Sequence, residues 1–214
     1  MKVTKAQAQA NRALVVETAS KLFRERGYDG VGVADLMAAA GFTHGGFYRQ
    51  FGSKTDLMAE SAACGMAQTA ALTVGVDPLQ FVEQYVSREH RDARSTGCTM
   101  AALGGDAARQ PEVVRSTFAD GIESLLAALS GEGAVLNGAD SGQGRAKLLD
   151  IFAHAVGAIV LSRACPDDSP LADEILAACR NEIRASLSPP VCSTAKMRAT
   201  TRKRNDSCSP SSSG

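Results

Sequence analysis

The segment GFTHGGFYRQFGSK, between Gly41 and Lys54, constrains the fold of this chain more than any other part of its sequence. After the glycines, aromatic residues recur with helical spacing: Phe47 and Phe51 are four positions apart and therefore share one face of a helix. The polar residues around them are left on the other face. A short helix with an aromatic back and a polar front, entered through a glycine turn, is how a recognition helix is mounted for the major groove of DNA.

The residues on either side predict the neighbouring helices. Upstream, one helix face is indicated by apolar residues spaced i, i+3, i+4, i+7 at Val33, Leu36, Met37 and Ala40. Gly41 stands where a glycine just past the last turn ends a helix, and Thr43 is placed to cap the next one with its hydroxyl. Downstream, Ser53 and Asp56 form the Ser-x-x-Asp pattern of a further helix start. The sequence thus predicts two short helices in a tight pair.

The rest of the chain also has helical periodicity and no strand-like alternation. A long helix is predicted over residues 5–26 and ends at Gly27. Later helices are expected at residues 78–93, 98–110, 111–132, 145–164 and 171–187, with a loop at 131–144 that is rich in Gly and Ser. The fold class predicted from these patterns is all-α.

The run LFRERGYDGVGVADLMAAAGFTHGGFYRQFGSKTDLM resembles the DNA-binding domain of the TetR/AcrR family of transcriptional regulators, from about residue 13 to residue 60. The resemblance rests on ERGYDG, AAGF, GxFYxxF and SK, in that order and spacing. It implies a helix-turn-helix DNA-binding domain at 1–52 and a helical effector-binding and dimerisation domain at 53–188. It further implies a ligand-responsive regulator of transcription, expected to be a repressor that a small molecule releases from its operator.

The resemblance also implies which residues meet DNA. Tyr48 matches the family's tyrosine that touches the phosphate backbone, and Lys54 matches the lysine that opens the following helix. The expected DNA-binding residues are Thr43, His44, Gly45, Gly46, Tyr48, Arg49 and Lys54. The chain departs from the family where a Ser or Thr usually precedes the second helix, because Val31 and Gly32 stand there without a hydroxyl.

The effector pocket is expected among helices between residues 77 and 130. Its candidate lining residues are Phe81, Tyr85, Met100, Leu103 and Phe118, with His154 as a further candidate. Periodicity alone would place the same residues in an ordinary core. His90 lies in the charged segment SREHRDAR and is expected to be in solvent.

The helix at 145–164 is apolar almost all the way round, so it must be covered on every side. We therefore expect the last two helices to form a four-helix interface with a second copy, in a homodimer whose recognition helices reach successive major-groove turns of a palindromic operator, about 34 Å apart. The expected interface residues are Leu148, Phe152, Ala155, Ile159, Ile175, Cys179 and Ile183. The alternative is that both helices belong to the core of a monomer.

The net charge is zero, but it is unevenly distributed along the chain. Residues 1–60 carry eight Lys and Arg against six Asp and Glu, residues 61–188 carry ten against sixteen, and residues 189–214 carry five against one. DNA affinity depends on the local charge that faces phosphates and not on the chain total. The basic end segment 189–214, rich in Pro, Ser and Thr, is predicted to be a disordered tail.

Composition also limits the other possibilities. Six cysteines without a CxxC pair or a Cys/His cluster suggest no metal site and no disulfide scaffold, and they fit the reducing cytoplasm. No secretory signal and no apolar run long enough to cross a bilayer is seen. No cofactor is expected. We expect no enzyme, because no nucleophile elbow, phosphate loop or paired carboxylates are present.

The sequence also allows two other hypotheses for the function of the chain. One is a helical adaptor that binds protein instead of DNA. The other is a redox- or electrophile-sensing regulator that acts through Cys98, which follows Gly97 at a predicted helix start, where the helix N-terminus favours a thiolate. Burial of Cys98 as a small apolar residue competes with this second reading.

Overall fold

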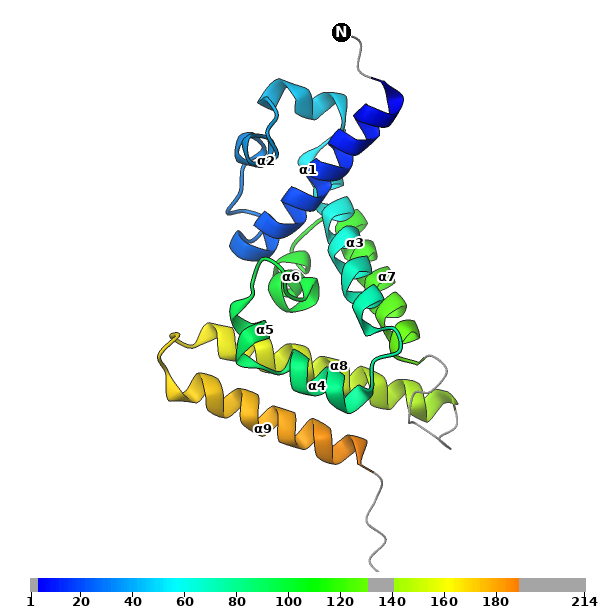
Figure 1. Ribbon diagram of the computed structural model, residues 1–214, viewed down its shortest axis with the longest axis vertical. Coiled ribbons are helices and arrows are strands. Elements are labelled where there is room, and N and C mark those ends of the chain that lie inside the picture. Colours follow the sequence, from blue (N-terminus) through cyan, green and yellow to red (C-terminus); the bar gives the residue numbers. More distant parts are fainter. Residues whose placement is uncertain (1–3, 131–140, 189–214) are drawn as a thin grey trace, which may run out of the picture.

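The computed structural model describes residues 4–130 and 141–188, and this part of the chain is helical throughout, with short turns and no strand (Figure 1). In chain order the elements are α1 (Lys5–Arg26), α2 (Val33–Ala39), the 3₁₀ helix η1 (His44–Arg49), α3 (Lys54–Thr73), α4 (Pro78–Tyr85), α5 (Arg88–Asp92), α6 (Thr99–Ala107), α7 (Glu112–Leu129), α8 (Ser141–Ala164) and α9 (Pro170–Leu187). The predicted all-α fold is confirmed. The predicted tail, residues 189–214, lies outside the described residues.

Glycines end the first two helices, as the sequence predicts. Gly27 follows α1 with a φ of 74°, and Gly41 follows α2 with a φ of 80°. Only glycine adopts such left-handed backbone angles without strain. After α2 the Phe42 N–H donates to the Met37 carbonyl at 2.8 Å, which satisfies a carbonyl that the helix itself leaves free. The chain thereby turns sharply and delivers η1 beside α2.

Helices α1, α2 and η1 form an N-terminal unit, and the later helices, α3 to α9, adjoin it through contacts of α1 with α3 and α6. Helices α3 and α7 lie side by side, and α8 and α9 pack against each other at the far end of the molecule from η1 (Figure 1). Helix α6 lies between α1 and α8, so it contacts both the N-terminal unit and the later helices. Among the described residues, no helix is long and apolar enough to cross a membrane.

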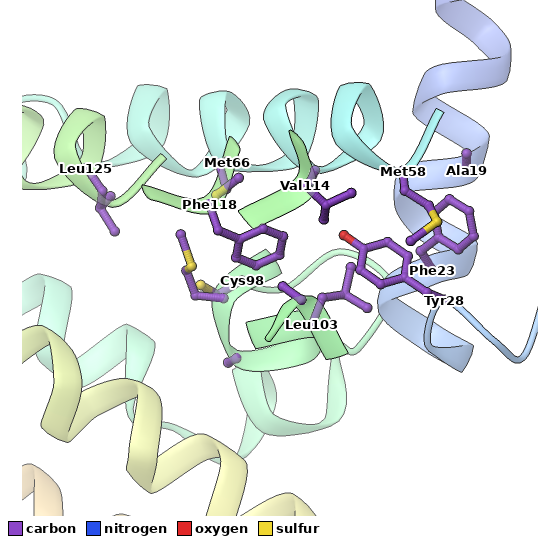
Figure 2. Close-up of a cluster of buried hydrophobic side chains, with 14 of the residues drawn as sticks. Ala19, Phe23, Tyr28, Met58, Met66, Cys98, Leu103, Val114, Phe118 and Leu125 are labelled. Atoms are coloured by element: carbon purple, nitrogen blue, oxygen red, sulfur yellow. The ribbon is translucent and has the colours of Figure 1, made fainter. Parts of the chain in front are cut away.

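One hydrophobic core runs from the N-terminal helices into the later ones. Phe23 of α1 and the neighbouring Tyr28 pack edge to face, with ring centroids 5.0 Å apart. Figure 2 shows the Tyr28 ring reaching from this side toward Leu103 of α6 and Val114 of α7. The hydroxyl of Tyr28 is buried without a hydrogen-bond partner among the described residues, and burial raises the pKa of this phenol. The N-terminal helices and the later helices therefore pack around one continuous hydrophobic core.

The structure corrects some local predictions. The recognition segment is a 3₁₀ helix, and the Thr43 hydroxyl makes no capping hydrogen bond. Gly45 and Gly46 explain the first difference, since two glycines disfavour a regular α-helix. The predicted helix 78–93 is divided, because the Ser87 hydroxyl accepts a hydrogen bond from the His90 N–H and starts α5 as a new helix. Helix α8 begins four residues earlier than predicted, at residue 141.

Candidate functional site

The back of η1 is anchored by two buried phenylalanines. Phe47 is fully buried and Phe51 nearly so, and their ring centroids lie 5.4 Å apart. The Arg12 guanidinium of α1 lies 4.6 Å from the centre of the Phe51 ring, in position for a cation–π contact. The predicted aromatic back of the recognition segment is therefore present, and it fixes which side of η1 faces away from the protein.

The front of η1 is open. Tyr48 is 67% exposed, and the His44 ring stands edge-on to it with centroids 6.2 Å apart. Arg49 and Thr43 are also exposed, and the Arg49 side chain makes no ion pair or hydrogen bond with any described residue. A phenol, an imidazole and a guanidinium thus lie on one accessible surface with their hydrogen-bonding groups uncommitted, which suits contacts to phosphates and base edges.

The two glycines of η1 do not touch anything that requires them. A Cβ atom added at Gly45 would meet nothing within 4 Å, and one added at Gly46 would meet the Met37 side chain at an ordinary 3.5 Å. Neither glycine has a positive φ. Gly45 is exposed and adds no side chain to the surface that carries His44, Tyr48 and Arg49, so another molecule can approach its backbone closely.

Arg12 is a positioning residue that sequence reasoning missed. Its guanidinium forms a two-pronged ion pair with Glu60 of α3 and donates to the Gln50 carbonyl at 3.2 Å, just after η1. A single side chain therefore joins α1, η1 and α3. The partners are 38 and 48 residues from Arg12 in the chain, so no local pattern could have revealed the contact.

Lys54 is committed within the protein. Its ammonium donates to the Tyr28 carbonyl at 2.6 Å and lies 5.9 Å from the centre of the Phe23 ring. The first residue of α3 thus holds the turn after α1. An ammonium has three donors, so the predicted phosphate contact stays open for the two that remain.

The start of α2 lacks the hydroxyl that the family usually has there. The Gly32 N–H instead donates to the Asp35 carboxylate at 3.2 Å, one turn into the helix. This contact stabilises the helix start from inside, since a carboxylate near a helix N-terminus is favourable. It offers nothing to a DNA phosphate.

A cavity of about 190 Å³ lies between α3, α4 and the α5–α6 connection. Of the predicted pocket residues, Phe81 and Tyr85 line it, whereas Met100, Leu103 and Phe118 are buried in the core and His154 lies on α8 away from this cavity. The sequence did not indicate that Thr69, Thr73, His90 and Cys98 also line it. None of the lining residues carries a carboxylate, ammonium or guanidinium group.

The sequence predicts His90 in solvent, and this prediction is wrong. His90 lies in the wall of this cavity. Its Nδ1–H donates to the Tyr85 carbonyl at 2.7 Å, and its Nε2 accepts from the Cys98 N–H at 3.0 Å. Acceptance of a backbone N–H requires the neutral ring, and burial lowers the pKa of His90 below its usual value. His90 therefore ties α4 to the start of α6.

The residues expected at a dimer interface differ in how far the single chain buries them. Phe152, Ala155, Ile159 and Ile183 are buried within the single chain, while Leu148, Ile175 and Cys179 are half-buried. The large apolar side chains that remain exposed on α8 and α9 are Leu149, Val160, Leu161 and Leu171. The inner stripe of α8 is thus core, and its outer side is uncovered in one chain.

The geometry at the N-terminal end defines a class of protein. Helix α2, the Gly41 turn and η1 form a helix-turn-helix with a buried aromatic back and an open polar front, which is the arrangement of a DNA-binding protein. Residues 15–60 match the family model described as bacterial regulatory proteins, tetR family. Residues 15–60 are therefore a helix-turn-helix DNA-binding domain of the TetR type, and the family that carries this domain consists of transcriptional regulators and not of enzymes.

Solved structures show that the fold extends over nearly the whole described chain. E. coli NemR in its reduced form is similar with a TM-score of 0.62 and 21% identity, over 85% of this chain and 99% of that one. A TetR-family regulator from Agrobacterium tumefaciens has a TM-score of 0.64 and 21% identity, over 83% and 98%. One from Chloroflexus aurantiacus has a TM-score of 0.58 and 24% identity, over 84% and 96%. No curated protein matches the chain.

Proposed function

We propose that this regulator is a repressor that binds a palindromic operator as a homodimer and is released by a small-molecule effector. The observation that carries the proposal is the open polar front of η1 on its buried Phe47 and Phe51 base, combined with an uncharged cavity behind α3. Helix α3 begins beside η1 and lines the cavity at its other end. It is thus the element through which a ligand would move the recognition segments.

We infer that Thr43, His44, Tyr48, Arg49 and Lys54 contact DNA, together with the backbone at Gly45 and Gly46. The test begins with selection of bound sequences from random DNA, followed by titration of the selected operator. Arg49→Ala is expected to weaken binding and to lower the slope of log affinity against log salt by about one, as for the loss of one phosphate contact. Arg115→Ala, an exposed arginine on α7, is the matched control and should leave the slope unchanged. Equal slopes for all three proteins would contradict the assignment.

We propose the cavity at Tyr85 as the effector site and an uncharged, mainly apolar molecule as its ligand. The lining has aromatic faces and hydroxyl groups but no charged group that would offset the desolvation of an ion. Thr69→Phe should fill the cavity, so that the protein still binds its operator but no longer responds to an effector. Gln68→Phe, at the exposed neighbouring position, should respond normally. Release of Thr69→Phe by the same compound at the same concentration would exclude this cavity.

The homodimer is proposed to form through the outer faces of α8 and α9. Leu171 is 52% exposed, and Leu149 and Leu161 are exposed on α8, so a second copy would cover apolar side chains that water now contacts. Leu171→Glu should produce monomers in sedimentation, whereas Leu72→Glu, at an exposed position of α3, should not. A wild-type protein that sediments as a monomer at micromolar concentration would refute the dimer.

A second candidate is an electrophile- or redox-responsive regulator. It is favoured by the position of Cys98 in the cavity wall, at the N-cap of α6 and hydrogen-bonded through its backbone to His90. A small electrophile that entered the cavity would meet this thiol. Cys98→Ser should then abolish release of the operator by electrophiles, and Cys165→Ser, which replaces a half-buried thiol elsewhere, should not. A Cys98→Ser protein that is still released would dispose of this candidate.

A further inference from the structure

A second cleft, of about 370 Å³, lies where the N-terminal unit meets the later helices. Its walls come from the end of α1, from α6 and from the last turns of α8. Figure 1 shows α6 between these two helices, at the opposite end of α1 from η1. The cleft is distinct from the cavity at Tyr85, because the two share no lining residue.

Three arginines, Arg24, Arg94 and Arg163, line this cleft, and none of them has a carboxylate partner among the described residues. Arg24 is buried, with Nε donating to the Ser95 carbonyl at 2.8 Å. Arg163 donates from Nε to the Arg91 carbonyl at 2.8 Å and from Nη2 to the His90 carbonyl at 3.0 Å. Carbonyl oxygens orient these guanidinium groups but do not neutralise their charge.

Each of these arginines keeps hydrogen-bonding capacity for a ligand. Arg24 makes no hydrogen bond from Nη2, Arg163 makes none from Nη1, and the exposed side chain of Arg94 makes none at all with the described residues. Burial lowers the pKa of Arg24 and that of Arg163, the latter also because Arg94 is close. The charged form of Arg24 is thus disfavoured by burial, and that of Arg163 by burial and by the nearby charge of Arg94.

Two carboxylates complete the lining, and both have cationic partners. Asp106 pairs with Arg109 at 2.8 Å and also accepts from the Tyr28 N–H at 3.3 Å. Glu25 lies 3.9 Å from its neighbour Arg26. Neither carboxylate is within ion-pair distance of the three arginines. The cleft thus has an excess of positive charge that the protein itself does not offset.

We propose that this cleft is a binding site for a small anion, either a carboxylate or a phosphate. Planar guanidinium groups are suited to both anions, because they present paired N–H donors to two oxygens at once. The anion would contact α1 through Arg24 and α8 through Arg163. It would therefore join the DNA-binding unit to the later helices at a place separate from the effector cavity, and the site does not depend on the identity of any effector.

The experiment is calorimetric titration of the full chain with sodium phosphate and, separately, with sodium succinate, at constant ionic strength held by chloride. Wild type is expected to bind at least one of them with a single saturable site per chain, and the stronger arm identifies the anion class. Arg94→Gln should weaken that binding about tenfold, as for the loss of one charge-assisted hydrogen bond at a partly exposed site. Arg94→Glu should abolish it.

Arg115→Gln is the matched control, because Arg115 is an exposed arginine on α7 outside the cleft. It should bind the anion as wild type does. Arg94 has no side-chain partner within the described part of the chain, so its variants are expected to fold, which circular dichroism checks. Absence of saturable binding by wild type, equal affinity of Arg94→Gln and wild type, or an equal loss in Arg115→Gln would each overturn the proposal.

Discussion

Polar side chains have opposite environments at the two ends of α1. Near η1, Arg12 pairs with Glu60, and both side chains are about two-fifths exposed. At the other end Arg24 is buried and donates to the Ser20 hydroxyl at 2.9 Å and to the Ser95 carbonyl. Water competes for the first set of contacts but not for the second. The difference teaches that the ion pair beside η1 is exchangeable with water, whereas the contacts of Arg24 are part of the packed interior where α1 meets α6.

The largest expected effect tests the base of the recognition segment. Phe47→Ala removes a fully buried ring and should lower the free energy of unfolding by about 3–5 kcal/mol. Tyr48→Ala, at the adjacent exposed position, should change it by less than about 0.5 kcal/mol while weakening operator binding. Urea unfolding and DNA titration measure the two quantities. A Tyr48→Ala protein as unstable as Phe47→Ala would erase the contrast between back and front.

The next largest effect tests the packing where α3 meets α1 and α6. A Cβ atom at Gly65 of α3 would overlap with Arg24 Nη1 and with Thr99 Oγ1. Gly65→Ala must displace a buried hydrogen-bonded group and should lower the free energy of unfolding by up to about 3 kcal/mol. A Cβ atom at Gly105 of α6 would meet nothing within 4 Å. Gly105→Ala should therefore raise the free energy of unfolding by about 0.5–1 kcal/mol, because alanine favours helix more than glycine does. Thermal and urea unfolding would show whether the signs differ as expected.

A smaller effect concerns the dependence of folding stability on pH that His90 produces. The pKa of His90 is lower in the folded chain than its usual value near 6.5, so the unfolded chain binds the proton more tightly. Stability from His90 is therefore complete at neutral pH and is lost as pH falls below about 6.5.

The test variant for this effect is His90→Gln. It should lose about 2 kcal/mol at pH 7, because a glutamine cannot replace both ring hydrogen bonds. Its stability should also vary less than that of wild type between pH 7 and 5. Parallel stability curves for the two proteins over this range would show that another group causes the pH dependence.

The smallest expected effect lies at the exposed end. A double-mutant cycle of Arg12→Ala and Glu60→Ala should give a coupling free energy below about 1 kcal/mol that decreases with added salt, as for other exposed pairs. A coupling of several kcal/mol that resists 1 M salt would mean that the DNA-binding end is held as rigidly as the packed interior where α1 meets α6. Operator affinity of the same variants would report how far Arg12 positions η1.

Much of the helix-turn-helix could be predicted from the sequence, because its signals are local. Glycines with positive φ end α1 and α2 at the expected residues, and Ser53 caps α3 through the Asp56 N–H at 3.1 Å. The burial of Phe47 and Phe51 follows from their four-residue spacing. Caps and periodicity involve residues within one helical turn of each other, so the chain order contains them.

The regions that only the tertiary structure decided depend on distant partners. Arg24 and its acceptor Ser95 are 71 residues apart. His90 was expected in solvent, but its ring is held by the Tyr85 carbonyl and the Cys98 N–H, and the contact of Lys54 with the Tyr28 carbonyl also joins residues far apart in the chain. Likewise, a helix as apolar as α8 does not reveal which of its faces the same chain covers and which is left open. Local propensity fixes helices and their ends, but burial, charge compensation and cavities arise from long-range packing, and those decide where a ligand can bind.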